Sequence, residues 1–228
     1  MEAPKIQPIV GQSSRSDQVY AALREALLSG VFAPGDQVHE GQLAEYLNVS
    51  KTPVREAMSS LRAKGLLTPG PKRGILVAEV DATTVKELYE VRALLEPEAV
   101  RRAVPKVDSK LVTRARRLLD EAQRHGKRQD LNALSQSNRD FHELLYQECD
   151  NSKIKLILND MRDQLQFAAV SGWRGVTSSW EYERTEHLAI LEAVAEGDVE
   201  RAELLSREHI ERASAKILNS HKPTDTVA

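Results

Sequence analysis

Three of the six histidines lie where a helical bundle would bury them. His142, His187 and His209 each share a helix face with Leu, Val, Ile or Ala at helical spacing, so each side chain is predicted to point inward. Asn138 lies one helical turn before His142, which places both on one face of one helix, as two ligands of one ion require. A single buried histidine is more simply interpreted as a hydrogen-bonded core residue. Three imidazoles on inward faces of three helices leave several polar groups to satisfy, and this favours a shared site.

These donors are typical of a site for a divalent transition metal. Imidazole nitrogens suit Zn²⁺ or Ni²⁺, and Mn²⁺ or Fe²⁺ are also compatible. Arg92 is a candidate for an anion contact, because it follows Val91 on a helix otherwise lined with Leu and Val. The anion is either a bound ligand or Glu96, one turn later. The border of the same pocket could also include Arg139, Gln166, Trp173 and Arg174.

A second group of residues has the chemistry to bind a polyanion. Two short helices, at about residues 40–47 and 50–64, are separated by a tight turn, which is the helix-turn-helix pattern. The second helix begins with short hydroxyls and long cations that can face the major groove and the phosphates of DNA: Ser50, Lys51, Thr52 and Arg55. A solvated cationic helix end is the alternative interpretation. The turn spacing and the hairpin that follows favour DNA.

The predicted β-hairpin joins residues 66–68 to residues 75–78 and forms a wing beside the helices. Its tip carries Lys72, Arg73 and Gly74. The two cations predict contact with phosphate or with a groove edge, and Gly74 would let the backbone approach that partner closely.

The fold class is predicted as mainly α, with two domains. We expect a flexible arm at 1–15, a winged helix-turn-helix of three helices plus a small β-hairpin at 16–80, an all-helical bundle at 81–219 and a disordered tail at 220–228. Ser16 is expected to cap the first helix. Pro97 should kink or break the first bundle helix, which has Val91 on its buried side. Six bundle helices should begin near Asp81, Asp108, Leu131, Asn151, Trp180 and Asp198, with a loop at 171–179.

The composition limits the class of protein. A formal net charge of -2 over 228 residues excludes a uniformly basic nucleic-acid binder of the histone kind. The single cysteine cannot form an intrachain disulfide, which fits a reducing compartment. The chain lacks a signal-peptide pattern and an apolar segment of bilayer length. We therefore expect a cytoplasmic protein with no membrane partner.

One run of residues reads Glu40-x-x-Leu43-Ala44-x-x-Leu47-x-Val49-Ser50-Lys51-Thr52-Pro53-Val54-Arg55-Glu56-Ala57 and is followed by Leu61, Gly65-Leu66 and the basic wing. This run resembles the GntR family of bacterial transcription regulators. A second set comprises Glu90-x-Arg92-x-x-x-Glu96, Phe141-His142, Asn151, His187 and His209, and is similar to the FCD effector domain of the FadR-like branch. The likeness covers about residues 16–218. It implies a homodimer, a double-stranded operator with two half-sites, and DNA affinity that changes when a small metabolite binds.

The resemblance also implies roles for single residues. Metal-binding FCD domains use an Asp and three His, which the three histidines match, while Asn138 stands in place of the Asp. A neutral amide oxygen should hold the ion less tightly but leave it more positive toward an anionic effector. The resemblance favours a carboxylate ligand for Arg92. Gly41 stands where some members carry an arginine, so base readout would rest more on Lys51 and Arg55.

The sequence therefore predicts a transcription regulator, and we expect a repressor. A small carboxylate metabolite, bound at a metal-containing cavity of the helical domain, would control its operator affinity. One alternative is a metal-dependent enzyme that uses the three histidines, but HExxH, nucleophile-elbow and phosphate-loop motifs are absent. The other alternative is a DNA-binding protein whose helical domain only dimerises. We expect no enzymatic activity.

Overall fold

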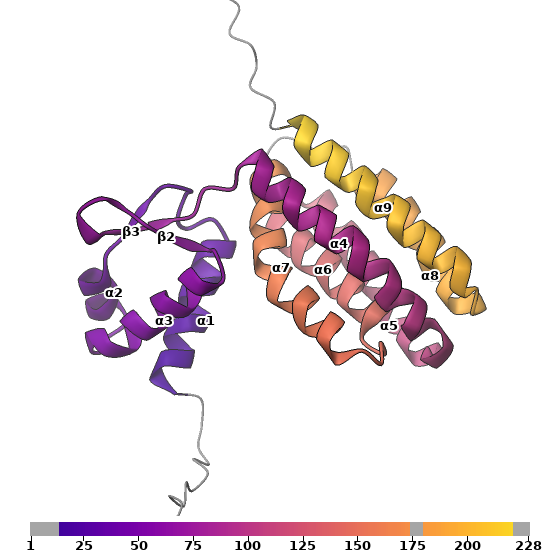
Figure 1. The fold of residues 1–228 in the computed structure, drawn as a ribbon, viewed down its shortest axis with the longest axis horizontal. Helices are drawn as coiled ribbons and strands as arrows, with labels where there is room; N and C mark the ends of the chain where they lie inside the picture. Colours follow the sequence, from indigo (N-terminus) through magenta and orange to yellow (C-terminus); the bar gives the residue numbers. More distant parts are fainter. Residues whose placement is uncertain (1–13, 174–179, 221–228) are drawn as a thin grey trace, which may run out of the picture. The chain divides into compact units, whose positions relative to one another are not determined.

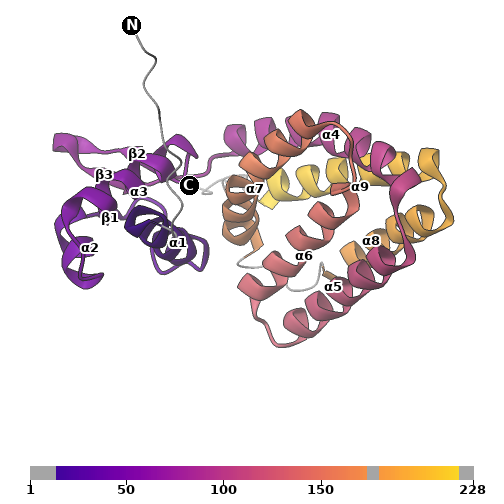
Figure 2. The same ribbon diagram turned by 90° about the horizontal axis from the view of Figure 1, so that it is seen from below.

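The computed structural model describes residues 14–173 and 180–220, which form two compact units, one up to Ala78 and one from Glu79. Figures 1 and 2 show a small mixed unit in the first part of the chain and an all-helical unit in the second. This is the predicted fold class, a winged helix-turn-helix followed by a helical domain.

The described part of the first unit contains three helices and a three-stranded antiparallel sheet of order β1-β3-β2. Its elements are α1 (Arg15–Leu28), β1 (Gln37–Val38), α2 (Glu40–Tyr46), α3 (Lys51–Ala63), β2 (Leu67–Pro69) and β3 (Ile75–Val77). Helix α1 packs against α3, and the apolar faces of both helices are buried between them. This packing fixes α3, the predicted reading helix, to a small hydrophobic core.

The first helix begins earlier than predicted, because its cap is Ser14 and not Ser16. The Ser14 hydroxyl accepts a hydrogen bond from the Asp17 backbone N–H at 3.0 Å, and the Asp17 carboxylate accepts one from the Ser14 N–H at 2.9 Å. This reciprocal capping box satisfies two donors that a helix start leaves unpaired. The predicted arm at 1–15 therefore ends before Ser14, and residues 1–13 lie outside the described residues.

Strand β1 was not predicted from the sequence, because two residues are too few to show an alternating pattern. It pairs with β3, so that Gln37 lies opposite Leu76. The pairing also explains why residue 74 is a glycine. A Cβ atom on Gly74 would lie 3.0 Å from the Pro71 carbonyl oxygen and 3.0 Å from the Gln37 side-chain nitrogen. The close approach expected at Gly74 is thus made within the wing itself, between the turn and β1.

The described residues of the second unit form a short 3-10 helix, Val104–Lys106, and six α-helices. They are α4 (Ala82–Ala103), α5 (Ser109–Lys127), α6 (Leu131–Tyr146), α7 (Ser152–Trp173), α8 (Trp180–Glu196) and α9 (Val199–Ser220). Helix α4 packs along α9 and α5 along α6, while α8 contacts both α5 and α9 (Figure 2). The predicted loop at 171–179 is wrong at its start, because α7 continues through Trp173, and residues 174–179 lie outside the described residues.

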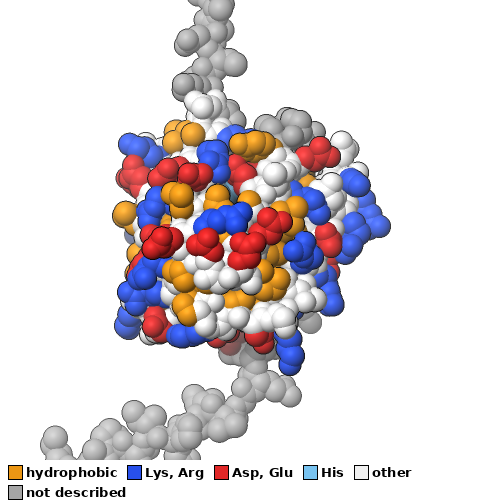
Figure 3. All heavy atoms as spheres, turned by 90° about the vertical axis from the view of Figure 1, so that its right-hand side faces the viewer, with side chains coloured by type: hydrophobic (Ala, Val, Ile, Leu, Met, Phe, Trp, Pro, Cys, Tyr) orange, Lys and Arg blue, Asp and Glu red, His pale blue; other side chains and the backbone are white. Residues whose placement is uncertain are grey.

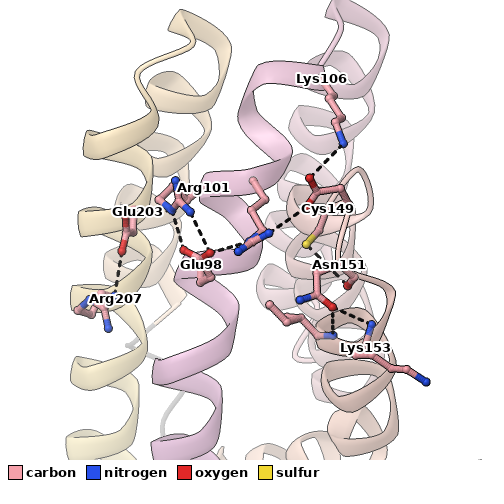
Figure 4. Close-up of polar contacts among 11 residues, drawn as sticks. Glu98, Arg101, Lys106, Cys149, Asn151, Lys153, Glu203 and Arg207 are labelled. Carbon is pink, nitrogen blue, oxygen red and sulfur yellow. Dashed lines mark hydrogen bonds and ion pairs between the residues drawn. The ribbon is translucent and has the colours of Figure 1, made fainter.

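Side-chain caps start several of these helices. Asp81 and Asp108 each accept a hydrogen bond from the backbone N–H three residues later, as predicted from their positions. Asn151 caps α7, where its side-chain oxygen accepts bonds from Lys153 N at 3.0 Å and Ile154 N at 3.2 Å (Figure 4). The Asn151 of the family-like pattern therefore has a structural role.

The surface of the second unit mixes charges of both signs. On the face drawn in Figure 3, basic and acidic side chains are interspersed with apolar ones, and neither sign forms a continuous patch. Some charges of this unit form ion pairs, such as Arg101 with Glu98 on the same helix and with Glu203 on α9 (Figure 4). Such partly exposed pairs contribute little to stability. The mixed charges on the face drawn in Figure 3 do not mark a polyanion site.

The buried face of α4 differs from the prediction at Val91. The Val91 side chain is 38% exposed, whereas Arg92 and Glu96 are 8% and 4% exposed. Hydrophobic periodicity predicted that Val91 is buried and placed Arg92 only near the buried face. The structure reverses this order, because Arg92 and Glu96 form an ion pair with each other and can be buried together.

Pro97 lies inside α4 without ending it, so of the predicted kink or break, the break does not occur. Proline has no N–H, so the carbonyl of Ala93 loses its helical partner. Arg207 on α9 replaces that donor, with its Nη1 atom 3.1 Å from the Ala93 oxygen, while its Nη2 atom pairs with Glu203 (Figure 4). A side chain from the neighbouring helix thus lets α4 continue across the proline.

Arg207→Ala should lower the free energy of unfolding by about 1 kcal/mol, because the partly buried Ala93 carbonyl loses its donor. Pro97→Ala returns a backbone N–H to the same carbonyl, so Arg207→Ala should cost less in that background. Urea unfolding of the four proteins, followed by circular dichroism, measures this coupling. Arg201→Ala is the control, because it removes an exposed arginine from the same helix. Equal losses in both backgrounds would contradict the capping role.

Candidate functional site

Three imidazoles from three helices meet in the interior of the second unit. His142 of α6, His187 of α8 and His209 of α9 are 7%, 0% and 2% exposed, and we call them the three-histidine cluster. Their ring centroids are 4.4 to 5.2 Å apart. One nitrogen from each ring can be chosen so that all three lie within 4.8 Å of one another. The structure therefore brings together the histidines that the sequence placed on separate inward faces.

Two carboxylates orient the rings of this cluster. Glu96 lies 2.7 Å from His142 Nδ1, and Glu186 lies 2.6 Å from His209 Nδ1. Each Nδ1 atom is therefore assigned the proton, which leaves the lone pair on Nε2. His187 Nε2 lies 3.0 Å from His209 Nε2. The His187 and His209 rings thus present their Nε2 atoms toward each other, and a carboxylate behind a ring is the arrangement that raises the ligand strength of a histidine.

Burial keeps the His142 and His187 rings neutral. It lowers the pKa of His142 to about 4, although the neighbouring Glu96 carboxylate acts in the opposite direction. Burial also lowers the pKa of His187 well below its usual range, with the nearby His209 and His142 adding to the effect. Neutral imidazole is the form that binds a metal, so no proton has to be displaced from these two rings near pH 7.

The donor set fits a divalent transition metal. His142 Nε2 and Asn138 Oδ1 are buried without a hydrogen-bond partner among the described residues. An unsatisfied buried acceptor costs about 1–3 kcal/mol, which a cation at this point would remove. Three imidazole nitrogens and one amide oxygen suit Zn²⁺ or Ni²⁺. The residues present are therefore compatible with the predicted ligand set of Asn138 and the three-histidine cluster.

A polar cavity of about 60 Å³ adjoins the cluster. His142, His209 and Asn138 line one side of it, while His187 is absent from the lining and packs against Phe141 and Trp180. The other polar lining residues are Tyr89, Arg92, Glu96, Ser135, Arg139, Tyr146, Arg162, Gln166, Glu183 and Lys216. The volume is enough for a few waters or a small polar ligand.

Arg92 in this cavity forms the ion pair that was the alternative to a ligand contact. Its Nε atom lies 2.6 Å from Glu96 Oε2, and its Nη2 atom lies 3.3 Å from Glu96 Oε1. Burial by itself would raise the pKa of Glu96, but the Arg92 guanidinium and the His142 ring reverse this and hold it well below its usual range. Glu96 therefore stays ionised and joins Arg92 to His142 through one buried carboxylate.

Sequence reasoning missed several cavity residues. Glu96 was considered only as a partner for Arg92, and Glu186 and Glu183 were not considered at all. Burial raises the pKa of Glu183, which Lys216 partly opposes from 3.1 Å away. Helical spacing predicts the pair of Glu96 with Arg92, but no local pattern predicts the other glutamate contacts, because each of these joins two different helices. Of the suggested border residues, Arg139 and Gln166 do line the cavity. The side chain of Trp173 and all of Arg174 lie outside the described residues.

The predicted DNA-contacting residues of the first unit gather at the start of α3. Ser50 is the N-cap residue, but its side chain makes no capping bond, so its hydroxyl is not used by the helix. Lys51, Thr52 and Arg55 are exposed nearby. Arg55 donates from Nε and Nη2 to Glu40 on α2, at 3.1 and 2.8 Å. This pairing was not predicted.

The other two predicted cations lie in the wing. Lys72 and Arg73 are exposed in the turn between β2 and β3, where both have positive φ angles of 52° and 62°. Bulky residues rarely adopt this left-handed conformation, which costs about 1–2 kcal/mol per residue. The turn therefore holds two cations in a strained but exposed position.

Comparison with known proteins agrees with this arrangement. Residues 15–77 match the profile described as "Bacterial regulatory proteins, gntR family", and residues 87–212 match the FCD domain. The chain belongs to the GntR family of bacterial transcription regulators. Its carboxyl-terminal unit is an FCD domain, a type of domain known to bind metals, and the three-histidine cluster lies within it. Membership identifies this GntR protein as a transcription regulator and not as an enzyme.

Individual relatives support the assignment. An uncharacterised regulator of Bacillus subtilis, YdhC, is 31% identical over 187 residues, which cover 81% of this chain and 83% of that protein. The Nta operon transcriptional regulator of Aminobacter aminovorans is 29% identical over 189 residues, 82% of this chain and 87% of the relative. A GntR regulator structure from Rhodococcus sp. RHA1 superposes with a TM-score of 0.81 at 26% identity, covering 92% of this chain and 100% of that one.

Within the described residues, none of the helices combines the length and apolar character needed to cross a membrane.

Proposed function

We propose that this GntR protein is a homodimeric repressor whose operator affinity is controlled by a divalent metal and a small carboxylate in the FCD domain. The observation that carries the proposal is the convergence of three buried imidazoles and an unsatisfied amide oxygen beside a cavity lined by Arg92. Repression is also consistent with RspR of Escherichia coli, a relative named as a transcriptional repressor that is 24% identical over 202 residues.

The proposed metal ligands are Nε2 of His142, His187 and His209, with Asn138 Oδ1. Glu96 and Glu186 hold two of the rings in the orientation that ligation needs. The bound ion would supply a positive charge at the cavity wall. All four ligands are neutral, so the ion would keep a larger share of its charge than it would with the usual carboxylate ligand. This makes an anion the natural effector.

Arg92 can contribute to the same anion site without leaving Glu96. A guanidinium has five N–H donors, and Glu96 uses only the edge formed by Nε and Nη2. The other edge, formed by the two Nη atoms, is available for a carboxylate. The small volume of the cavity favours a short hydroxy acid or sugar acid over a long chain.

Control of transcription follows from differential binding. If the effector binds better to the form of the dimer that cannot contact both operator half-sites, operator affinity falls by the ratio of the two effector affinities. An FCD domain that only dimerised would have no use for a polar cavity with unsatisfied buried acceptors. The cavity therefore favours a sensor over a purely structural domain.

Titration calorimetry with Zn²⁺ or Ni²⁺, after removal of metal with chelator, should find one site per chain. His187→Ala removes a ligand and should weaken binding by more than the roughly 10–100-fold typical of outer-shell changes. Asn138→Asp should strengthen it, because a carboxylate offsets the charge of the ion. His125→Ala is the control, because it removes a histidine of the same unit outside the cluster. Unchanged affinity in His187→Ala would rule out the assigned site.

A thermal-shift screen of lactate, malate and gluconate, with and without metal, tests the effector. At least one acid should raise Tm when metal is present and lower operator affinity about tenfold. Arg92→Lys keeps the charge that Glu96 requires but loses the two-pronged contact, so this shift should disappear. Arg101→Lys, on the same helix but outside the cavity, should keep it. A shift that survives in Arg92→Lys would exclude Arg92 from the effector site.

Arg55→Ala should abolish the shifted band in a gel-shift assay at the protein concentration that just saturates the operator with the wild type, because a base-contacting arginine contributes about 1–3 kcal/mol of discrimination and also attracts phosphate. Helix content and dimerisation should not change. Arg62→Ala removes another exposed arginine from α3 and should bind nearly as well as the wild type. Unaltered binding by Arg55→Ala would contradict the assignment of α3 as the reading helix.

A further inference from the structure

We propose that Glu40 is a positioning residue that sets the orientation of the Arg55 guanidinium for reading a guanine. The inference rests on the proposed role of Arg55 in DNA binding. It adds a specificity-determining residue whose charge is wrong for contact with phosphate.

The geometry is that of a two-pronged pair between two helices. Glu40 is the first residue of α2, and Arg55 lies in the second turn of α3. The carboxylate accepts from Arg55 Nε at 3.1 Å and from Arg55 Nη2 at 2.8 Å. The Arg55 side chain is 70% exposed, and so would otherwise sample many rotamers. Two parallel bonds fix both the position and the plane of its guanidinium.

The edge that Glu40 uses leaves the reading edge available. Arginine has five N–H groups, and the pair uses the one on Nε and one of the two on Nη2. One N–H on each Nη atom then points away from Glu40, and these two are parallel. Guanine presents two acceptors, N7 and O6, side by side in the major groove, and a guanidinium binds them with two parallel donors. The pair therefore prepares Arg55 for guanine and does not compete with it.

The charge of Glu40 also has a predictable effect on non-specific binding. A carboxylate close to the phosphates repels them regardless of the base sequence, so it weakens binding to every duplex. The orientation of Arg55 compensates for this loss only where a guanine is correctly placed. Glu40 thus lowers non-specific affinity and raises specific affinity, which is how negative and positive contributions combine to give selectivity.

Two simpler roles for Glu40 make different predictions. An acidic residue in the first turn stabilises a helix through its dipole, and the pair could merely tie α2 to α3. Either role would change stability or affinity for all DNA, with no change in the preference for one sequence. Alternatively, the pair could hold Arg55 away from DNA, in which case removing it would strengthen operator binding. The ratio of specific to non-specific affinity separates all of these from positioning.

The experiment uses the full-length protein and two duplexes. One is selected from a random pool by the wild type, and the other is a scrambled duplex of equal composition. The specificity ratio is the dissociation constant for the scrambled duplex divided by that for the selected duplex, both at one salt concentration. It is measured for the wild type, Glu40→Gln, Arg55→Ala and the double variant. Glu45→Gln is the matched control, because it removes one exposed carboxylate from the same helix.

Glu40→Gln should lower the specificity ratio about tenfold, toward the lower end of what one bidentate pair discriminates. The loss should come from weaker binding to the selected duplex, with equal or tighter binding to the scrambled one. Glu45→Gln should change the ratio less than about twofold. In the Arg55→Ala background, Glu40→Gln should lower the ratio no further, because the group it positions is gone.

An unchanged ratio in Glu40→Gln, a tighter complex with the selected duplex, or an equal loss in the Arg55→Ala background would each overturn the proposal. If Glu40→Gln melts at a lower temperature than Glu45→Gln, Glu40→Asp is tested in its place. Its affinity is then measured for selected duplexes in which 7-deazaguanine replaces one guanine at a time. The penalty for losing one N7 acceptor should then shrink in Glu40→Asp, and an unchanged penalty counts against positioning. If the wild type itself does not prefer the selected duplex, the proposed regulator function fails too, which distinguishes the two failures.

Discussion

The interior of the FCD domain depends on one buried carboxylate. Glu96 is 4% exposed, and it accepts hydrogen bonds from Arg92 on its own helix and from His142 on α6. Removing one partner of a buried ion pair typically costs about 3–5 kcal/mol, because the remaining charge stays in a poorly solvating interior. Glu96, Arg92 and His142 must therefore lie together for α4 and α6 to pack as they do. This requirement also fixes the His142 ring, whose Nδ1 atom faces Glu96 and whose Nε2 atom has no hydrogen-bond partner among the described residues.

The same donor geometry occurs in both units, with different consequences. Arg92 and Arg55 each use Nε and Nη2 to hold a glutamate, which leaves the Nη edge for another acceptor. Around Arg92 the pair is buried, so its main effect is on stability and on the neighbouring histidine. Around Arg55 the pair is exposed, where ion pairs add little to stability. Its effect there is to limit the orientations of a long side chain.

The helical domain combines buried imidazoles with cationic groups around a small space. Burial keeps His142 and His187 unprotonated, and the carboxylates of Glu96 and Glu186 sit behind the rings. Asn138 adds an acceptor that nothing else in the described part of the chain satisfies. A site built from neutral ligands beside Arg92 is electrostatically suited to an anion. In the proposed regulator, such a site would let the concentration of a metabolite act on operator affinity.

The sequence by itself determined what depends on local spacing. It predicted the helix-turn-helix, the wing cations, the caps at Asp81 and Asp108, and the inward faces that carry the histidines. Helical periodicity reports which face of a helix is buried, but not which other face it meets. Only the tertiary structure decided that three such faces converge, that Glu96 joins Arg92 to His142, and that Glu40 holds Arg55. It also decided that α4 continues through Pro97, because the donor that replaces the missing N–H comes from Arg207 on another helix. These contacts join residues of different elements, and their formation depends on the packing of the whole bundle.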